Sequence, residues 1–400
     1  MEGLIAAASA ASSIGPEEEL HWLALTLIPG LGTRMAGKLL DRFRTPQTVF
    51  RVSRSELEAA GLSGAVAQSV ASGCSFEDAL DQQRKMTERG AVAIVRSDPR
   101  YPSLLREIFD PPVMLFARGR LELLQPFHFA VVGTRRPTPY GLAVAERLAA
   151  DLARAGLTIV SGMARGIDTL AHKGALSAGG DTVAVLGCGV DVIYPSENRK
   201  LATELYTKGL VLSEFAMGST AFPQNFPIRN RIISGMSAGV LVVEGAQYSG
   251  SAITAKLALD QGREVFAVPG NITSKSSWGP NLLIKQGAKL VQDWNDVIVE
   301  LPAEVRRQLI ERGRTRLLGN AGASPDGGPA SHLGGTTEGS LPEVGRRLLA
   351  VLQVDTAIHL DDLLQILEDS SASELIAALF ELEMLGLVKQ LPGKNFVKVW

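Results

Sequence analysis

The stretch FAVVGTRRPTPYGLAVAERLAADLARAGLTIVSG, residues 129–162, contains one complete repeat of the pattern that decides the fold. A short apolar run ends at a glycine, a helical stretch follows, and a second short run rich in β-branched residues closes the repeat. Strands that are apolar almost throughout and alternate with helices are typical of a parallel sheet covered on both faces. The stretch therefore predicts a strand–helix–strand unit of an α/β domain.

The same alternation continues towards the C-terminus. Further strand-like runs are TVAVLG (182–187), LVLSE (210–214), GVLVVE (239–244), EVFAVPG (264–270) and KLVQ (289–292). Residues 91–126 carry two more strand-like pieces that lead into the first repeat. We predict an α/β fold with a Rossmann-like, doubly wound and mostly parallel sheet.

Different patterns flank this region. Apolar periodicity predicts helices over 17–29, 30–43, 53–61 and 75–90, and the last sixty residues read as three helices followed by two short strands, a winged-helix pattern. Residues 319–340 include seven glycines and two prolines, which indicates a linker. The predicted organisation is a helical domain similar to SAM or helix-hairpin-helix modules (1–90), an extended Rossmann-like domain (91–310), a flexible linker (311–340) and a winged-helix domain (341–400).

Composition excludes several classes of protein. With 46% apolar and 20% charged residues among 400, the chain is not disordered as a whole. A net charge of −2 excludes a protein that holds polyanions by bulk charge, so phosphate binding needs a local site. Cys74 and Cys188 form neither a disulfide framework nor a zinc cluster, and the first fifteen residues do not resemble a signal peptide. We expect a cytoplasmic protein with no membrane span, no metal and no cofactor.

The loops that follow the predicted strands converge on one edge of the sheet, where ligands of open α/β sheets bind. They contain glycines, small hydroxyl side chains and helix N-termini, which together favour anions, and arginines suited to phosphate. Several such sites along one edge suit a chain of phosphates better than one nucleotide. The segment Arg229–Arg231, placed at the start of an apolar helix, puts two guanidiniums at a positive dipole end, which requires an anion or an acidic partner.

Each feature also has a simpler interpretation. A glycine-rich turn after a parallel strand is often only a tight connection, and GCGVDV (187–192) lacks the third glycine of a dinucleotide fingerprint. Asp168 and His172 lie four residues apart, but a capping carboxylate and a hydrogen-bonded histidine are favoured over a catalytic pair. Glu214 and Glu244 are either general bases or carboxylates that tie neighbouring loops together.

Taken together, the motifs resemble one known family. YPSLLREIFDPPVMLFARG, VVGTRRPTPYG, SGMARGIDTLAHKGAL, GCGVDVIYPSEN, FPIRNRIISG and VVEGAQYSGSAITAKLA, with SEF and VPGNI, are similar in order and spacing to the DNA-processing protein A family (DprA, also called Smf) over about residues 98–292. The resemblance implies a bacterial cytosolic DNA-binding protein that is not an enzyme. It implies binding of single-stranded DNA, loading of RecA recombinase onto that DNA during recombination and natural transformation (competence), and a homodimer formed through the Rossmann-like domain.

The resemblance also implies the residues of the DNA site. Carried onto this sequence they are Gly133, Thr134, Arg135, Arg136, Ser161, Gly162, Ala164, Gly166, Arg229, Asn230, Arg231, Ser249, Gly250, Ser251 and Thr254, with Phe226 and Lys256 as weaker candidates.

Two other functions stay open at this point. A nucleotide-processing enzyme of the phosphoribohydrolase type on a Rossmann-like fold would use a carboxylate such as Glu244, although the P-G-G-x-G-T pattern of those enzymes is missing. A purely structural scaffold would pair the arginines internally with Glu214 and Glu244.

The flanking domains give weaker signals. The turn LIPGLG, residues 27–32, either points backbone N–H groups at a DNA phosphate or is a plain helical turn. The tail 341–400 has 5 basic and 9 acidic residues, so its predicted recognition helix would be repelled by DNA. We predict that the tail contacts proteins, and that only Lys389, Lys394 and Lys398 could touch a DNA backbone.

Overall fold

The computed structural model divides into two compact units, residues 1–316 and 317–400, which are described separately. It describes residues 14–125, 127–247, 249–309, 343–353, 356–367, 371, 374–376, 378–379, 382, 387–391 and 394–398. The predicted linker 311–340 lies outside the described residues, and the predicted domain boundaries stay predictions.

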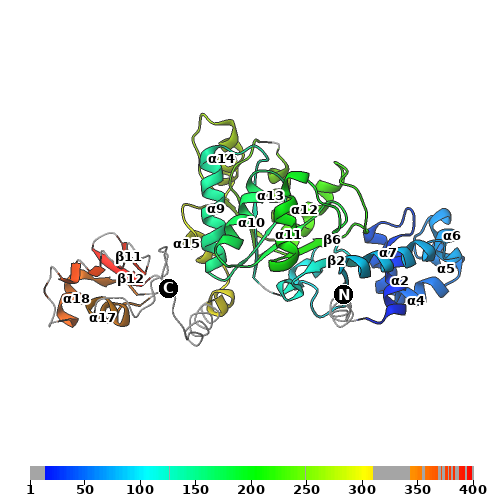
Figure 1. The fold of residues 1–400 in the computed structure, drawn as a ribbon, viewed down its shortest axis with the longest axis horizontal. Helices are drawn as coiled ribbons and strands as arrows, with labels where there is room; N and C mark the ends of the chain where they lie inside the picture. Colours follow the sequence, from blue (N-terminus) through cyan, green and yellow to red (C-terminus); the bar gives the residue numbers. More distant parts are fainter. Residues whose placement is uncertain are drawn as a thin grey trace. The chain divides into compact units, whose positions relative to one another are not determined.

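A nine-stranded sheet forms the centre of the first unit (Figure 1), in the order β1-β2-β6-β5-β4-β3-β7-β8-β9. All pairings from β6 to β9 are parallel, while β1 and β2 add an antiparallel edge. This confirms the predicted doubly wound, mostly parallel sheet. The strands are β1 (Val92–Val95), β2 (Met114–Gly119), β3 (His128–Val132), β4 (Thr158–Ser161), β5 (Thr182–Val185), β6 (Leu210–Ser213), β7 (Gly239–Val242), β8 (Glu264–Ala267) and β9 (Lys289–Leu290).

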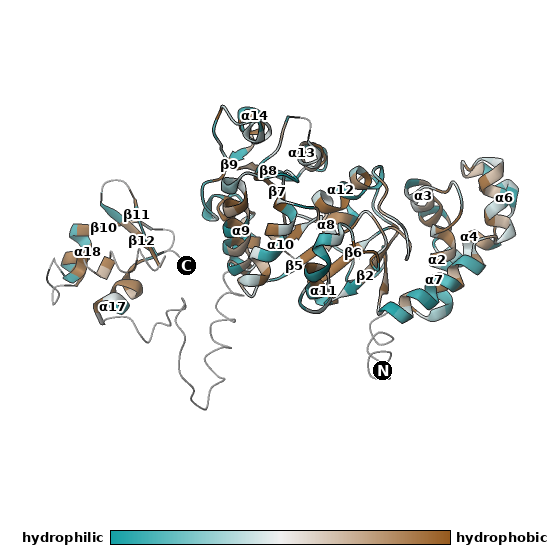
Figure 2. Ribbon diagram, turned by 45° about the horizontal axis from the view of Figure 1, so that its top comes forward, coloured by the Kyte–Doolittle hydropathy of each residue, from teal (hydrophilic) through white to brown (hydrophobic). Residues whose placement is uncertain are grey.

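Alternate strand residues point to opposite faces of the sheet. Because both sets are apolar, helices cover both faces. Ala130 and Val132 of β3 belong to a core shared with α8 (Ser103–Arg106), α12 (Asn225–Gly235) and α13 (Gly250–Asp260). Phe129 and Val131 belong to the core on the other face, shared with α9 (Pro139–Arg154) and α10 (Ile167–Ser177). Figure 2 shows apolar and polar residues on the same covering helix, for example on α9. The near-continuous apolar strands of the sequence are thus explained by burial on both faces.

The remaining elements of the α/β part are short. They are α11 (Arg199–Lys208), α14 (Trp278–Lys285), α15 (Asn295–Ile298) and the 3₁₀ turns η1 (Leu121–Leu124), η2 (Ser196–Asn198) and η3 (Lys275–Ser277). Residues 303–309 are helical as well.

The N-terminal residues form a group of helices, as predicted. They are α2 (Pro16–Thr26), α3 (Thr33–Phe43), α4 (Pro46–Arg51), α5 (Arg54–Ala59), α6 (Gly64–Ser72) and α7 (Phe76–Arg89), of which α4 and α6 were not predicted. The turn 27–32 joins α2 to α3, and Gly30 adopts a φ of +79°, a left-handed conformation that favours glycine.

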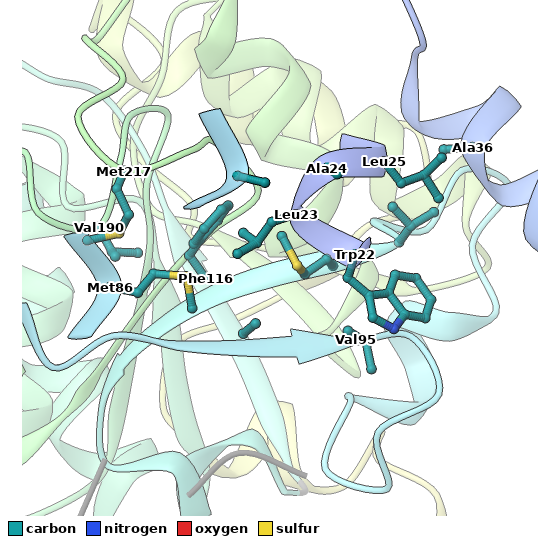
Figure 3. Close-up of a cluster of buried hydrophobic side chains, with 14 of the residues drawn as sticks. Trp22, Leu23, Ala24, Leu25, Ala36, Met86, Val95, Phe116, Val190 and Met217 are labelled. Atoms are coloured by element: carbon teal, nitrogen blue, oxygen red, sulfur yellow. The ribbon is translucent and has the colours of Figure 1, made fainter. Parts of the chain in front are cut away.

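These helices share a hydrophobic core with the edge of the sheet. Figure 3 shows Trp22 and Leu23 of α2 and Met86 of α7 in one cluster with Phe116 of β2 and Met217. The side chain of Gln82 adds two hydrogen bonds to the backbone of Met217: its Oε1 accepts from the N–H at 2.7 Å and its Nε2 donates to the carbonyl at 3.3 Å. The helical part is therefore docked on the α/β part by apolar contacts and by a buried polar pair.

The second unit contains α17 (Glu343–Val351), β10 (Ile358–His359), α18 (Leu360–Ile366), β11 (Val388–Leu391) and β12 (Asn395–Lys398). The strands form a small antiparallel sheet in the order β10-β12-β11. Residues 374–376, 378–379 and 382 are helical as well. Leucines from the helices pack against Val388 and Phe396 of the sheet. The helices with their following strands confirm the predicted winged-helix fold, and β10 is an additional strand.

Candidate nucleic-acid interface

A cleft of about 600 Å³ opens at the carboxyl edge of the parallel strands. It lies at the point where the strand order reverses, because the neighbours of β3 in the sheet are β4 on one side and β7 on the other. Loops that leave such a switch point in opposite directions form a crevice between them. Residues of the loop after β3, the loop after β4, the N-terminal part of α12 and the loop before α13 line the cleft.

Two arginines and two aromatic rings form one corner of the lining. Arg135 and Arg136 are exposed, and neither forms an ion pair with any residue that the structure describes. The guanidinium of Arg135 lies 5.2 Å from the ring centroid of Phe226, and the ring of Tyr194 stacks on Phe226 with centroids 5.6 Å apart. This corner of the cleft offers positive charge for phosphates and aromatic faces for bases.

The N-terminal end of α13 borders the same cleft, and that of α9 follows the lining loop after β3. Thr138 caps α9 by accepting a hydrogen bond from Gly141 N–H at 3.2 Å, and Ser249 caps α13 by accepting from Ala252 N–H at 3.3 Å. Gly250, the first residue of α13, is exposed, and added side-chain atoms there would meet nothing within 4 Å. A phosphate can therefore approach the positive end of this helix closely.

Glu244 ties the loop after β3 to the loop after β7. Its carboxylate accepts hydrogen bonds from the backbone N–H of Thr138 at 2.9 Å and from the Thr138 hydroxyl at 2.6 Å, while its carbonyl accepts from Thr134 N–H at 2.7 Å. A Cβ at Gly141 would lie 2.3 Å from the Glu244 carboxylate, so this packing requires glycine. Both carboxylate oxygens are engaged, which supports the loop-tying role over that of a general base.

Asp168 plays a similar part in the loop after β4. The buried carboxylate accepts from the N–H of Gly162 at 3.1 Å and from that of Ala164 at 3.4 Å. Burial raises the pKa of Asp168, and the nearby guanidinium of Arg229 opposes this. Gly166, with a φ of +79°, lets this loop pass the loop after β3, because a Cβ there would lie 2.4 Å from the Thr134 carbonyl oxygen. The two loops are locked together beneath the cleft.

Arg229 lines the cleft but is buried, with 4% of its surface exposed. Its guanidinium donates to the carbonyl of Gly162 at 2.7 Å and to the carbonyl of Val185, joining the ends of β4 and β5. Burial lowers the pKa of Arg229 to about 10, and the carboxylate of Asp168 opposes this. Gly162 is required here, since a Cβ would lie 2.4 Å from the guanidinium. The geometry gives Arg229 a structural role at the floor of the site.

Arg231 lies outside the cleft lining. Its side chain is 8% exposed and forms ion pairs with Glu214 at 2.5 Å and with Asp110 at 3.2 Å. The acidic partner that the sequence required for this arginine is therefore present. Burial raises the pKa of Glu214, and Arg231 opposes this shift. Arg231 is therefore committed to these two internal partners.

The expected helix start near Arg229 was wrong. Helix α12 begins at Asn225, so Phe226 and Pro227 lie in its first turn and the arginines lie in its second. Proline is tolerated in the first turn, where no N–H is needed for the helix. Arg229 and Arg231 are consequently held by tertiary partners and do not stand at a free helix end.

The other predicted residues fall into two groups. Asn230 and Thr254 line the cleft with Gly133, Thr134, Ala164, Ser249, Gly250 and Ser251. Ser161, Gly166 and Lys256 do not line it; the Ser161 hydroxyl is buried and donates to the Val131 carbonyl at 2.7 Å, and Lys256 is exposed further along α13. Gly162 borders a small adjoining pocket of about 40 Å³.

His172 is a buried, hydrogen-bonded residue, as the simpler interpretation expected. Its Nδ1 lies 2.7 Å from the hydroxyl of Thr182, and that hydroxyl donates to the Ile159 carbonyl at 2.7 Å. The hydroxyl has only one proton, so Nδ1 must carry the proton of the imidazole and donate. Burial lowers the pKa of His172 to about 3, so the ring is neutral.

Sequence reasoning missed several residues that shape the site. Tyr194 lines the cleft, Asn198 donates to the Met163 carbonyl at 2.8 Å, and Asn225 donates to the Gly187 carbonyl at 3.0 Å. Tyr194 and Asn198 belong to the YPSEN segment, which carried the family resemblance without being assigned a role. For Tyr194 and Asn198 the available signal was the polar YPSEN segment itself, which follows GCG (187–189) a few residues downstream.

Two kinds of feature are absent from the described residues. No group of histidine, cysteine or carboxylate side chains there is arranged to hold a metal ion. No helix there is long and apolar enough to cross a membrane.

Comparisons with known proteins agree with this architecture. Residues 92–302 match the family model described as DNA recombination-mediator protein A, and residues 336–394 match the model of the DprA winged helix domain. The chain is 45% identical to the DNA processing protein DprA of Bacillus subtilis over 216 residues, which cover 54% of this chain and 73% of that protein. It is 31% identical to the protein Smf of Synechocystis sp. over 401 residues, covering 95% and 98% of the two chains.

A solved structure is similar too. The X-ray structure of DNA processing protein A from Streptococcus pneumoniae superimposes with a TM-score of 0.65 at 36% sequence identity, covering 71% of this chain and 98% of that one.

Proposed function

Because the chain belongs to the DNA-processing protein A (DprA/Smf) family of DNA recombination mediators, we propose that it binds single-stranded DNA in the cleft at the carboxyl edge of its parallel sheet. The observation that carries this proposal is the combination of Arg135 and Arg136, exposed and without carboxylate partners in the described structure, with the stacked rings of Phe226 and Tyr194. A groove that pairs cations with aromatic faces suits an unpaired strand, whose bases are free to stack.

The proposed binding surface consists of the residues that are accessible at the cleft. Arg135 and Arg136 bind phosphates, the N–H groups at the start of α13 bind another phosphate, and Phe226 with Tyr194 stacks on bases. Gly162, Gly166, Arg229 and Arg231 act beneath the surface by holding the loops in place. None of these contacts reads the edge of a base, so binding does not depend on the nucleotide sequence of the DNA.

The direct test is fluorescence anisotropy of a labelled oligothymidine at several salt concentrations. Replacement of Arg135 or Arg136 by alanine removes one phosphate contact, so we expect a several-fold weaker affinity and a salt slope smaller by about 0.7 per lost contact. The matched control is Arg147→Ala, which removes an arginine that is 80% exposed on α9. Equal binding by wild type and both cleft variants would reject the proposed site.

We further propose that the bound strand is handed to RecA recombinase in the cytosol, that the α/β part forms a homodimer, and that no reaction is catalysed. The first two proposals rest on the family resemblance, and the engaged carboxylate of Glu244 supports the third. The readouts are the rate of RecA filament formation on DNA covered by single-strand-binding protein, the molar mass in solution, and the absence of free base released from nucleoside monophosphates.

A further inference from the structure

The segment 29–54 in the N-terminal helices concentrates positive charge. It contains six basic residues and one carboxylate, Asp41, whereas the neighbouring helices α2 and α7 begin with acidic residues. The basic residues are Arg34, Lys38, Arg42, Arg44, Arg51 and Arg54. A local excess of this size in a chain of net charge −2 marks a surface suited to an anionic partner.

Three of these residues lie on one exposed face of α3. Arg34, Lys38 and Arg42 follow one another at intervals of four, which places them along one side of a helix. The opposite face of α3 is buried through Ala36, Leu39 and Leu40 in the shared core. The helix is therefore fixed with its basic side towards solvent.

The one carboxylate of the segment is already engaged. Asp41 forms an ion pair with Arg96, which follows β1. Neither Arg34 nor Lys38 forms an ion pair with any residue in the described part of the chain. Arg42 lies near the Glu56 carboxylate, whose pKa it helps to lower, although the hydrogen bonds from Ser53 contribute more. The charge of Arg34 and Lys38 is thus available to a ligand.

An exposed aromatic ring accompanies these cations. Phe109, in the loop after α8, is 77% exposed, and the guanidinium of Arg34 lies 4.3 Å from its ring centroid. The next residue, Asp110, forms an ion pair with Arg231 of α12, and the first turns of α12 line the cleft. The ring and the basic face of α3 are therefore connected through one loop to the cleft wall.

From this arrangement we propose that Arg34, Lys38 and Arg42 of α3, together with Phe109, form a second contact surface for single-stranded DNA, here called the α3 surface. The cations bind phosphates, and the Phe109 ring stacks on a base of the same strand after it leaves the cleft. The inference rests on the proposed function of the cleft. A solvent-exposed ring beside unpaired cations favours nucleic acid over an acidic peptide, because only a nucleic acid supplies both phosphates and flat bases.

The test compares two lengths of oligothymidine with the full chain. A short oligonucleotide of about 6 nucleotides fits within one site, whereas one of about 30 nucleotides extends beyond it. For the triple variant Arg34→Ala, Lys38→Ala, Arg42→Ala we expect about tenfold weaker binding of the long strand, a salt slope smaller by about 2, and unchanged binding of the short strand. For Phe109→Ala we expect weaker binding of the long strand with an unchanged salt slope.

The matched control removes the same charge elsewhere in the N-terminal helices. Arg84, Lys85 and Arg89 on α7 are replaced together by alanine, which changes the net charge equally. Equal losses in both triple variants, or no loss in the α3 variant, would overturn the inference. If wild type binds both strands, Arg135→Ala weakens both, and the α3 variant binds both like wild type, the cleft proposal stands and the α3 surface is rejected. If wild type binds neither strand, both are rejected.

Discussion

At the residue scale, two arginines at the cleft carry the same charge in opposite surroundings. Arg135 is exposed and rests on the ring of Phe226, whereas Arg229 is buried and bonded to the carbonyls of Gly162 and Val185. An exposed cation can exchange water for phosphate, while a buried one is committed to its internal partners. Substitution of the two residues should therefore affect different properties of the protein.

Arg229→Ala is expected to lower the free energy of unfolding by about 3 kcal/mol, because it leaves two carbonyls and the nearby Asp168 without their cation. Arg229→Lys should recover only part of this, since a single ammonium cannot reproduce the guanidinium fork. Urea unfolding followed by circular dichroism measures both. Arg135→Ala is the control and should unfold like wild type, and a wild-type stability of Arg229→Ala would contradict the structural role.

His172 makes stability depend on pH. Its pKa of about 3 in the folded state lies below the ordinary value of 6.5, so the unfolded chain binds the proton more readily and stability falls as pH drops below 6.5. Between pH 7 and pH 5 this amounts to about 2 kcal/mol. Urea unfolding at the two pH values should show this loss in wild type, and a clearly smaller one in His172→Asn, whose amide can still donate to Thr182. Equal losses in the two proteins would exclude His172 as the cause.

The sequence left the roles of Asp168, Glu214 and Glu244 open for a physical reason. A carboxylate at a strand end can act on a ligand or bind a neighbouring loop, and the choice depends on which N–H groups or cations the fold brings within hydrogen-bonding distance. Asp168 and Glu244 accept loop N–H groups, and Glu214 pairs with Arg231. The residue types could be predicted as important, but their partners come from elements up to 106 positions away.

At the element scale, the strands were predictable and the helix limits less so. The seven apolar runs from β3 to β9 form strands where the sequence placed them. For β3 to β8 the reason is burial on both faces, which requires such runs, whereas both residues of the edge strand β9 are exposed. The start of α12 was misplaced by four residues, since the helix begins at Asn225 and includes Pro227 in its first turn. Helices α4 and α6, of 6 and 9 residues, are too short to show a clear period in the sequence.

The docking of the N-terminal helices gives a prediction at this scale. Gln82→Ala removes the buried partners of the Met217 N–H and carbonyl groups, so we expect a loss of about 1–3 kcal/mol in the free energy of unfolding. Thermal and urea unfolding provide the measurement. Glu88→Ala, an exposed change on the same helix α7, should have little effect. Similar stability of both variants would mean that the polar pair contributes nothing to docking.

At the scale of the whole molecule, the net charge of −2 conceals a division of charge along the chain. Residues 126–300 contain 16 basic and 14 acidic residues, and residues 341–400 contain 5 and 9. Within the first of these segments the cleft places Arg135 and Arg136 together, so local placement matters more than the total. The sequence predicted this division directly, because counting charges needs no coordinates, whereas the burial of Arg229 and Arg231 needed the fold.

This division leads to a prediction for the winged-helix unit. The first turn of its helix α18 carries the exposed Asp361 and Asp362, and residues 341–400 contain more acidic than basic residues, so we expect this unit to repel phosphates. We expect a chain ending at Arg316, the limit of the first compact unit, to bind single-stranded oligothymidine within about twofold of the full chain, with the same salt slope. We also expect the full chain to bind duplex DNA no more tightly than the truncated chain does, at any salt concentration.

Both forms are measured by anisotropy with single-stranded and duplex oligonucleotides. The double variant Asp361→Asn, Asp362→Asn of the full chain is the control for charge alone. A loss of more than tenfold on truncation would show that the acidic unit takes part in binding, since removal of negative charge by itself can only favour association with phosphates.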